Sequence, residues 1–560
     1  MDFDSVLREV GDFGKYQKRR LVLLGFPVLV GSINVFLQVF IAGKSGHWCQ
    51  SWESEDCGSF NVTEIQCENF KREISVPVTI SEDGKKSFEQ CEKYNVTGVD
   101  FEAAVGTVGK NVSLEIIPCD DGWVHDRSRF SSTIIMDFEL VCGKSYFPHI
   151  AQSVYIAGRM VGWTMFGLVS DTFGRRKTQL FSFICGGAFA IAITFSLNFW
   201  MYVILRFISA VLLSGASPFV LANEMVGPSR RVLAGNVMWI NFAVGYGVLA
   251  GLAKLIPNWR ILQLVVTLPY ILFFILTFFF IHESPRWLVN QSRTEDAEKV
   301  LRKMARENNK PIRGDFTLKN CTRNEIKHSI NLRGSFLDLI RSPVVILMMI
   351  NMAFNWTVQA FVYYGLSLST SELGIDPYIS FVISGAIEIP AYFSCVPVAE
   401  WLGRKGATFV TLFLGGIACC VTPVVPIGIP RAIVAMMGKF LITMSFSVAI
   451  TWALEMIPTS IRSSVLNMLS VASRLGAMLA PVILILQDTW SSLPVLIFGS
   501  LSIVAALLCL LFPETKGKPL PATVGDTKRL HSNNPEEFET DHGDGRKNLH
   551  MLLSESREQN

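Results

Sequence analysis

Five ionisable residues lie inside long apolar stretches of the sequence. They are Arg159, Arg206, Glu388, Lys439 and Arg474. A charged side chain in the middle of a membrane span costs roughly 2.5–3.5 kcal/mol on insertion scales, so each needs a role that offsets this cost. The chemistry open to them is charge recognition, because a carboxylate can hold a cation and a guanidinium or ammonium group can hold a carboxylate.

Glu388 and Arg474 are the two charges that we expect at the same depth. Glu388 is ten residues into the stretch that begins at 378 (388 − 378 = 10), or about 15 Å along a helix. Arg474 is about as deep in the stretch 464–487. We therefore expect both near the bilayer midplane, with Glu388 facing a cationic group and Arg474 a carboxylate. The alternative is that the two residues form a structural salt bridge with each other.

Aromatic side chains accompany these charges. Trp356 and Tyr363 are seven residues apart and share one face of a helix, and Phe446 follows in a later stretch. An aromatic ring attracts a quaternary ammonium group through its quadrupole, although a single ring in a membrane helix can equally serve packing. We expect these three rings to line a substrate pocket with Glu388, Arg474 and Lys439, while Lys439 could equally act in gating.

Twelve apolar stretches carry these residues, each near the ~20 residues that a helix needs to cross a bilayer. Their number, in a chain of 560 residues of which 50% are hydrophobic and 17% charged, predicts an all-α polytopic membrane protein rather than a soluble protein with buried helices. The net charge of +3 indicates no nucleic-acid partner. The stretches are 21–43, 146–170, 178–197, 200–222, 233–256, 259–281, 343–368, 378–399, 406–425, 432–455, 464–487 and 493–512.

The distribution of Lys and Arg predicts that both termini are cytosolic. Five bases precede the first stretch, and eight more lie in the short loops 171–177, 224–232, 401–406 and 456–463. The short loops on the other side carry Arg260 and Arg431 alone, and basic loops stay in the cytosol. We expect a multi-pass protein of the plasma membrane.

The segment 44–145 falls outside the cell under this topology. It holds six of the 12 cysteines, which predict three disulfides in fifteen possible pairings. It has no CxxC pair, so we expect no metal site. Three N-x-S/T sites, Asn61, Asn95 and Asn111, predict glycosylation. The cysteines are Cys49, Cys57, Cys67, Cys91, Cys119 and Cys142.

Two further segments are hydrophilic. The segment 283–342 is expected to be a cytosolic linker with helices, one of them over 294–308 with acids in its first turn. The tail 513–560 is expected to be disordered and cytosolic. With the N-terminus 1–20, these segments leave the six-helix halves 21–282 and 343–512.

An internal repeat relates the two halves. The segment 171–176 recurs at 400–405 and the segment 224–231 recurs at 455–462, with offsets of 229 (400 − 171) and 231 (455 − 224). Acids and guanidinia at helix ends can pair across a gate, although positive-inside loop charge alone would also supply these bases. The expected gating residues are Asp171, Gly174, Arg175, Arg176, Glu224, Arg231, Glu400, Arg404, Glu455 and Arg462.

The first of these segments resembles a known loop motif. Residues 167–176 read Gly-Leu-Val-Ser-Asp-Thr-Phe-Gly-Arg-Arg and resemble G-x-x-x-D-[RK]-x-G-R-[RK] of the major facilitator superfamily. Thr172 stands where that motif has a base, which puts one gate contact in doubt. This resemblance implies a major facilitator fold, in which two six-helix pseudo-repeats rock around a central site.

Other segments resemble the organic cation, anion and carnitine transporter family of that superfamily. They include Val-Gly-Asp-Phe-Gly-Lys-Tyr-Gln at 10–17, Glu-Ser-Pro-Arg-Trp-Leu at 283–288 and Glu-Ile-Pro-Ala-Tyr at 388–392. In this family anion and carnitine carriers have Arg at the position of Arg474, whereas Glu388 resembles cation and carnitine carriers. Ser447 stands where cation carriers tend to have Glu. The resemblance does not account for Arg159.

The expected function is transport of small organic ions by alternating access, with organic cations or zwitterions such as carnitine favoured. An organic anion transporter is one alternative, and a non-transporting receptor or sensor on the same fold is another. No Ser-His-Asp set, HExxH motif or phosphate loop is present, so we expect neither an enzyme nor a cofactor. The expected partners are the organic substrate, the lipid bilayer and, as an open question, a coupling ion.

Overall fold

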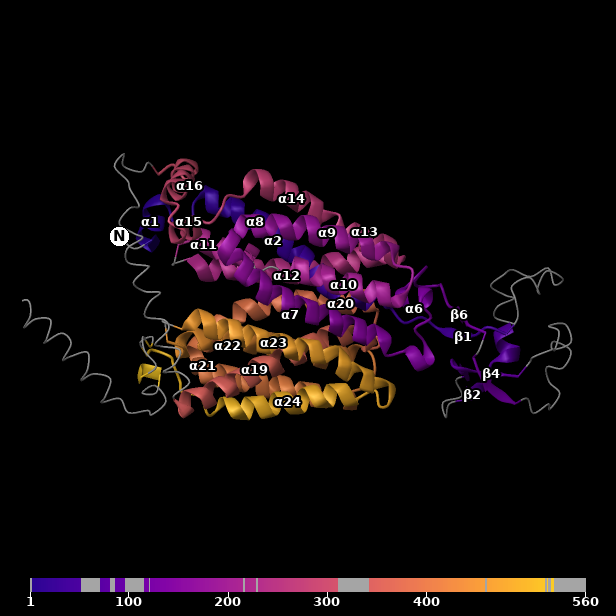
Figure 1. Cartoon of the computed structure of the whole chain (residues 1–560). Helices are drawn as coiled ribbons and strands as arrows, with labels where there is room; N and C mark the ends of the chain where they lie inside the picture. Colours follow the sequence, from indigo (N-terminus) through magenta and orange to yellow (C-terminus); the bar gives the residue numbers. More distant parts are fainter. Residues whose placement is uncertain are drawn as a thin grey trace, which may run out of the picture.

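The helices of this protein lie side by side in one elongated bundle (Figure 1). The computed structural model describes residues 3–51, 71–80, 86–95, 115–119, 121–214, 217–227, 230–310, 342–458, 461–518, 521 and 525–527. Short β-strands lie at one end of the bundle, and helices α1 (Phe3–Val10), α15 (Pro285–Asn290) and α16 (Thr294–Glu307) lie at the other end (Figure 1). The elements before the linker form one side of the bundle, and those after it form the opposite side.

Six spans make up the N-terminal half, within a few residues of the predicted stretches. Several spans are built from two or more helical segments, and the third contains a turn of π-helix, η3. The segments are α2 (Lys15–Phe36), α3 (Gln38–Ile41), α7 (Phe147–Phe173), α8 (Arg175–Phe181), η3 (Ser182–Gly186), α9 (Gly187–Ala192), η4 (Ile193–Phe195), α10 (Phe199–Leu213), α11 (Ser217–Met225), α12 (Arg231–Leu255), α13 (Trp259–Thr267) and α14 (Pro269–Phe280).

The C-terminal half contains six further spans. Element α21 consists of two helices that meet at a sharp turn at Gly403, where φ is 76° and a side chain would be strained, and each helix belongs to a different span. The segments are α19 (Pro343–Leu368), η6 (Ser369–Glu372), α20 (Pro377–Ala386), α21 (Glu388–Val421), η7 (Thr422–Val424), α22 (Ile429–Met456), α23 (Arg462–Leu484), η8 (Ile485–Asp488) and α24 (Leu493–Cys509).

The number of spans agrees with the twelve predicted. In the described ranges, nine helical stretches are long and apolar enough to cross a membrane. One of them, Pro377–Val424, has 48 residues, or about 72 Å of helix, and so supplies two spans. The nine stretches thus supply ten spans. The remaining two of the twelve are α24, which is apolar but shorter, and α7, which has 27 residues and carries the polar side chains of Gln152 and Arg159.

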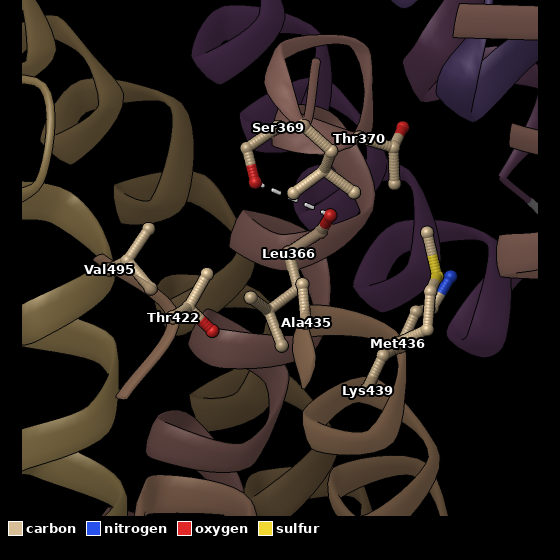
Figure 2. A pocket seen from close by; sticks show the side chains of 9 residues that line it. Leu366, Ser369, Thr370, Thr422, Ala435, Met436, Lys439 and Val495 are labelled. Atoms are coloured by element: carbon tan, nitrogen blue, oxygen red, sulfur yellow. Dashed lines mark hydrogen bonds between the residues drawn. The ribbon is translucent and has the colours of Figure 1, made fainter. Parts of the chain in front are cut away.

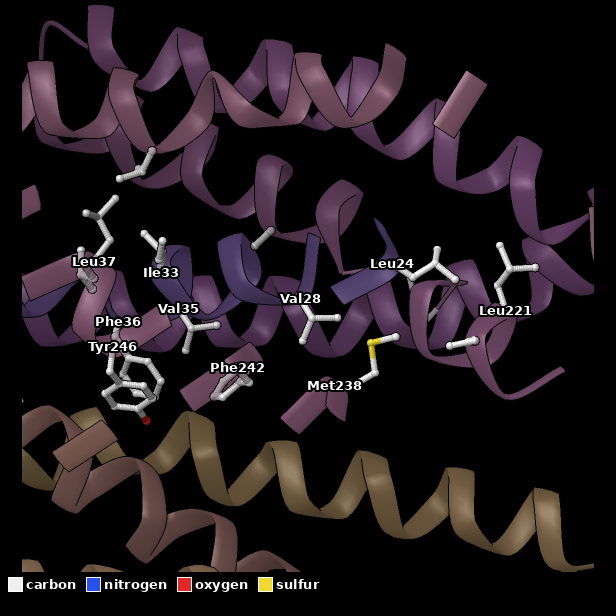
Figure 3. Packing of buried hydrophobic residues seen from close by; sticks show 14 of the residues in the cluster. Leu24, Val28, Ile33, Val35, Phe36, Leu37, Leu221, Met238, Phe242 and Tyr246 are labelled. Atoms are coloured by element: carbon white, nitrogen blue, oxygen red, sulfur yellow. The ribbon is translucent and has the colours of Figure 1, made fainter. Parts of the chain in front are cut away.

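The core of the N-terminal half is the contact between α2 and α12. The ring of Phe36 lies 4.6 Å from the ring of Tyr246 and 6.2 Å from that of Phe242, and Figure 3 shows these side chains together with the aliphatic residues of α2. The two helices approach closely because Gly245 faces Ser32, and a Cβ atom on Gly245 would collide with the Ser32 hydroxyl.

The two halves meet at the end of the bundle that carries the strands. Phe40 stacks on Tyr378 at 5.3 Å between ring centroids, and its ring lies 5.2 Å from that of Phe381. At the same end, the Ser145 hydroxyl donates to Asp488 at 3.0 Å. These contacts join α3, α20 and neighbouring segments, so they close the bundle on that side.

The described part of the segment 44–145, called the outer segment below, contains three two-stranded antiparallel sheets. They pair β1 (His47–Cys49) with β6 (Trp123–His125), β2 (Val78–Ile80) with β3 (Lys86–Phe88), and β4 (Glu92–Tyr94) with β5 (Ile116–Pro118).

Two of the expected disulfides are formed in this segment, Cys49–Cys119 and Cys91–Cys142. Cys57, Cys67, Asn61 and Asn111 lie outside the described residues, so their expected roles stay predictions.

The start of the linker folds back onto the N-terminus. The predicted helix is confirmed as α16 (Thr294–Glu307). Helix α16 packs against α15 (Pro285–Asn290), α1 (Phe3–Val10) and α2. The Asn308 side chain accepts from the Tyr16 amide at 3.0 Å and donates to the Val10 carbonyl at 3.1 Å. Residues 311–341 and 528–560, which include most of the expected disordered tail, lie outside the described residues.

The close approach of α2 and α12 yields a test of this packing. Gly245→Leu should lower the amount of folded protein, because an added side chain must push the helices apart, at about 1–3 kcal/mol for overpacking. Gly251→Leu is the matched control on the same helix, since nothing lies within 4 Å of its Cβ position. Size-exclusion chromatography of fluorescently tagged protein measures the folded fraction. Equal profiles for the two variants would contradict the packing described.

Candidate substrate site and gates

A buried ion pair lies in the middle of the C-terminal half. Glu388, the first residue of α21, accepts from Lys439 of α22 at 2.9 Å between Oε1 and Nζ, and the side chains are 0% and 1% exposed. The Tyr363 hydroxyl donates to the same carboxylate oxygen at 2.8 Å. Lys439 also donates to the Ser384 hydroxyl at 2.5 Å. A buried charge that loses its partner costs about 3–5 kcal/mol, so these contacts hold both groups in place.

Tyr246 of the N-terminal half completes this set. Its ring lies 4.4 Å from the Lys439 ammonium nitrogen, and its hydroxyl is 2.9 Å from the Tyr363 hydroxyl. Glu388, Lys439, Tyr363, Ser384 and Tyr246 are called the Glu388 cluster below. Because Tyr246 belongs to α12, the Glu388 cluster joins the two halves of the bundle.

The possible salt bridge between Glu388 and Arg474 is not formed. Glu388 binds Lys439, whereas the Arg474 guanidinium lies 4.0 Å from the ring of Trp163 on α7 and donates to the Ser470 carbonyl at 2.6 Å. A signal for the observed pair existed in the sequence. Lys439 and Glu388 are ten and eleven residues from the outer ends of their helical stretches (439 − 429 and 388 − 377), and so lie at matching depths.

Two other arginines lie in the spans of the N-terminal half. Arg206 is buried and donates to the Tyr202 hydroxyl at 2.7 Å and to the Gln152 side chain at 3.1 Å, so neutral groups satisfy part of its guanidinium. Arg159 is half-buried on α7 and close enough to Arg474 for their charges to repel. Among the residues that the structure describes, no carboxylate oxygen lies within 4.0 Å of Arg159 or Arg474.

The aromatic residues expected around the substrate fall into two groups. Tyr363 belongs to the Glu388 cluster. Trp356 and Phe446 contact each other edge to face, with 5.8 Å between ring centroids. The indole nitrogen of Trp356 is buried and makes no hydrogen bond within the described ranges. The contacts of these residues form three sets: the Glu388 cluster, the Trp356–Phe446 pair, and Arg474 on Trp163.

A small pocket borders the stem of Lys439 on its outer side (Figure 2). Its lining includes Leu366, Thr370, Met436 and Val495, and the Ser369 hydroxyl at its rim donates to the Leu366 carbonyl at 3.4 Å. All of these residues belong to the C-terminal half. Since a carrier holds its substrate between its halves, we do not assign the substrate to this pocket.

Arg175 is the centre of the expected gate in the N-terminal half. Its guanidinium binds Glu224 of α11 at 3.2 Å and also pairs with Asp171, one turn earlier on α7. The Glu283 carboxylate accepts from the backbone amides of Arg175 at 2.8 Å and Arg176 at 3.1 Å. Three acids thus hold the turn between the second and third spans.

The C-terminal half repeats this arrangement. Arg404 binds Glu455 at 2.9 Å, and the Glu514 carboxylate accepts from the backbone amides of Arg404 and Lys405, both at 3.0 Å. The offsets from the first gate are 229 (404 − 175), 231 (455 − 224) and 231 (514 − 283). Glu283 and Glu514 were not predicted as gate residues, although offsets of 229 to 231 residues between the two halves were a signal that could have found them.

Within the described ranges, three of the expected gating residues, Glu400, Arg176 and Arg462, make no ion pair. Glu400 is exposed, and Arg231 is half-buried at the start of α12. Arg176 donates to the Phe278 carbonyl at 2.6 Å, and Arg462 donates to the Ile457 carbonyl at 3.3 Å. Both bind backbone at a helix end instead of an acid. Gly174 provides the sharp turn before Arg175, with φ of 104°.

His47, Cys91 and Cys142 form a group of possible metal ligands in the described part of the outer segment. The two cysteines are joined in a disulfide, so neither offers a thiolate. We assign no metal centre to this group.

Comparisons with known proteins agree on one family. The model of the sugar (and other) transporter family matches residues 144–523. Solute carrier family 22 member 6-B of Xenopus laevis is 33% identical and aligns over 94% of this chain and 95% of its own length. Solute carrier family 22 member 13 of Homo sapiens is 32% identical over 94% of this chain and 93% of its own length. The organic cation transporter protein of Drosophila melanogaster is 32% identical over 99% of this chain and 99% of its own length.

Solved structures show the same fold. The partially occluded inward-open xylose transporter XylE of E. coli superimposes with a TM-score of 0.54 at 20% identity, over 68% of this chain and 90% of that chain. The inward-open form of the same transporter gives the same TM-score at 18% identity, over 71% of this chain and 93% of that chain. This identity is low, so the likeness shows the fold alone.

The repeated gate predicts equivalent roles for Arg175 and Arg404. Arg175→Gln and Arg404→Gln should each lower turnover about tenfold at normal surface amount, because each frees an acid that otherwise holds its turn. Lys405→Gln is the control, since its side chain makes no ion pair in the described part of the chain. The measurement is the initial uptake rate per surface-biotinylated protein. Equal losses in Lys405→Gln would show that loop charge alone matters.

Proposed function

We propose a function from the premise that this chain belongs to the organic cation, anion and carnitine transporter family of the major facilitator superfamily. It is a multi-pass membrane transporter of small organic ions and not an enzyme. The finer proposal concerns the charge of the substrate. We infer that the chain carries small organic anions across the plasma membrane by alternating access, and that Arg474 contacts the substrate carboxylate.

The contacts of the Glu388 carboxylate favour an anionic substrate over a cationic one. Its carboxylate is buried and already binds the Lys439 ammonium and the Tyr363 hydroxyl. A cationic substrate would have to displace Lys439, which would strand a buried ammonium group at a cost of about 3–5 kcal/mol. The sequence favoured cations or zwitterions because its spans carry both Glu388 and Arg474, and these contacts favour the anion alternative.

The surroundings of the Arg474 guanidinium are the observation that supports the proposal. Its guanidinium stacks on Trp163 and has no carboxylate within 4.0 Å among the described residues. A planar guanidinium offers two parallel donors to a carboxylate, and the indole ring beneath it limits its rotation. Arg474 lies on α23 and Trp163 on α7, so a substrate bound there would contact both halves.

The proposed cycle uses the two halves, 21–282 and 343–512, on either side of the linker 283–342. The aromatic contacts near the strands close one end, and the arginine gates stand at the end that carries α15 and α16. Both termini are proposed to be cytosolic. The two disulfides fit an outer segment that faces an oxidising extracellular space.

A zwitterion such as carnitine is the second candidate. The specific observation is the contact between buried Trp356 and half-buried Phe446, whose rings could receive a quaternary ammonium group while Arg474 holds the carboxylate. A receptor on the same fold is the remaining alternative class. Exchange of preloaded substrate against external substrate separates a carrier from a receptor, because only a carrier moves label in both directions.

Arg474→Ala should lower uptake of a labelled monocarboxylate ten- to a hundredfold, since about 1.4 kcal/mol corresponds to each factor of ten. Arg474→Lys, the charge-preserving control, should retain more uptake. A quaternary ammonium compound should gain nothing from Arg474 and should be transported poorly by every variant. The measurement is uptake per surface protein in cells. Strong Arg474-independent uptake of the ammonium compound would refute the anion proposal.

Glu388→Gln tests whether Glu388 acts in folding or in selectivity. The substitution strands Lys439 inside the bundle, so we expect less surface protein and an unchanged ratio of anion to cation uptake. Glu388→Gln combined with Lys439→Met, which removes both charges, should recover most of the surface amount. A selective loss of cation uptake at normal surface amount would assign Glu388 to substrate instead.

A further inference from the structure

Basic side chains from several elements gather around His282, at the end of the bundle that carries α15 and α16. The Lys303 ammonium of α16 lies 3.0 Å from His282 Nε2, and the Tyr16 hydroxyl of α2 lies 3.3 Å from His282 Nδ1. Arg20 of α2 and Arg176 of α8 are close enough for their charges to oppose protonation of His282. Arg20, Arg176, His282 and Lys303 are called the His282 cluster below.

The imidazole of His282 is neutral, so the charge of the His282 cluster comes from its other members. An ammonium group can only donate a hydrogen bond, so the contact with Lys303 requires His282 Nε2 to accept and the ring proton to lie on Nδ1. Burial, together with the charges of Lys303, Arg20 and Arg176, lowers the pKa of His282 to about 4. His282 therefore positions Lys303 near neutral pH without neutralising its charge.

Three cations face only two acids in this part of the described chain. Glu307, one turn after Lys303 on α16, binds Arg20 at 3.4 Å, and Glu283 accepts from the backbone amide of Arg176 at 3.1 Å. No carboxylate oxygen of the described ranges lies within 4.0 Å of the Lys303 ammonium or the Arg176 guanidinium. The Nε atoms of Arg20 and Arg176 are buried and make no hydrogen bond within those ranges. The His282 cluster thus combines a net positive charge with unused donors.

An apolar surface lies directly beside the His282 cluster. Helix α14 lies at the edge of the bundle (Figure 1), and Phe278, Phe279 and Phe280 near its end are 51%, 67% and 49% exposed. The Arg176 guanidinium donates to the Phe278 carbonyl at 2.6 Å and lies 5.8 Å from the Phe278 ring. Because α14 belongs to a membrane span, these rings contact acyl chains, and the cations lie where the span leaves the hydrocarbon.

An anionic phospholipid matches both surfaces at once. Its headgroup oxygens accept charge-assisted hydrogen bonds from Lys and Arg, and its acyl chains pack against exposed aromatic rings. Anionic lipids are concentrated in the cytosolic leaflet, where basic pockets beside membrane helices bind their headgroups. A transported substrate does not fit this place, since all members of the His282 cluster belong to the N-terminal half and the linker.

We propose that the His282 cluster binds the headgroup of an anionic phospholipid of the cytosolic leaflet, whose acyl chains lie along Phe278, Phe279 and Phe280 of α14. Because Lys303 belongs to α16 and Arg20 to α2, the lipid connects the linker to the first span. We therefore expect the lipid to stabilise the folded chain. The proposal does not depend on which substrate the chain carries.

The test measures the melting temperature of the purified full-length chain in detergent. Dioctanoyl phosphatidylserine should raise the melting temperature by about 2–4 °C, because a ligand that binds only the folded state stabilises it. Dioctanoyl phosphatidylcholine has the same acyl chains without net charge and should have a much smaller effect. Glycerophosphoserine is the same headgroup without acyl chains and should leave the melting temperature unchanged.

Two matched variants locate the site. Lys303→Gln should raise the half-saturating concentration of dioctanoyl phosphatidylserine about fivefold, the effect of removing one base at a membrane surface. Arg302→Gln is the control, since it removes the same charge at the adjacent position of α16, where the side chain is exposed and binds Glu298 at 3.4 Å. Arg302→Gln should keep the wild-type value. If Lys303→Gln does not fold, Arg176→Gln takes its place and must show the same loss.

Three outcomes would overturn the proposal. Equal stabilisation by phosphatidylserine and phosphatidylcholine would show that only the acyl chains are bound. Equal stabilisation by glycerophosphoserine and the intact lipid would assign the His282 cluster to a soluble anion. Equal losses in Lys303→Gln and Arg302→Gln would show that the general positive charge of α16 attracts the lipid, without a site at His282.

Discussion

The buried ion pair between Glu388 and Lys439 constrains the rest of the bundle. It places opposite charges on α21 and α22 in contact, and it draws in Tyr363 from α19 and Tyr246 from α12. Four helices from both halves must therefore be in register at one level. Because the pair leaves no net charge, the field in the space between the halves is set by the arginines that remain. In the described part of the chain, no carboxylate lies within 4.0 Å of Arg474 or Arg159, because Glu388 binds Lys439 instead.

The sequence was a good guide to the helices and a poor guide to the contacts between their charges. An apolar stretch of about 20 residues is a local property, so the predicted spans match the helices within a few residues. Which base faces Glu388 depends on the rotation and tilt of helices that are distant in the chain. Lys439 and Arg474 were both candidates by depth, and packing of α21 against α22 decided for Lys439. Trp163 and Tyr246 carried no sequence signal of their own.

The ion pairs of Arg175 and Arg404, at the expected gates, could be predicted in part. Charges at helix ends near the membrane surface are marked by motifs, and the repeat predicted that Arg175 and Arg404 would be equivalent. Their binding to Glu224 and Glu455 confirms that geometry. The capping role of Glu283 and Glu514 was missed because each lies more than a hundred residues from the amides that it binds. An offset of 229 to 231 residues, shared by three pairs, is nevertheless a pattern that sequence inspection can recover.

The positions of Glu283 and Glu514 in the chain determine the order in which the two turns can be capped during translation. Glu283 follows the sixth span directly, so the turn at Arg175 can be capped as soon as the first half has been made. The equivalent cap for Arg404 is synthesised 231 residues later (514 − 283), about 10–50 s at ordinary rates of translation. During that interval the first half already presents Tyr246, the residue that the Glu388 cluster requires. The N-terminal half, which is synthesised first, can thus serve as a template on which the C-terminal half assembles its buried charges.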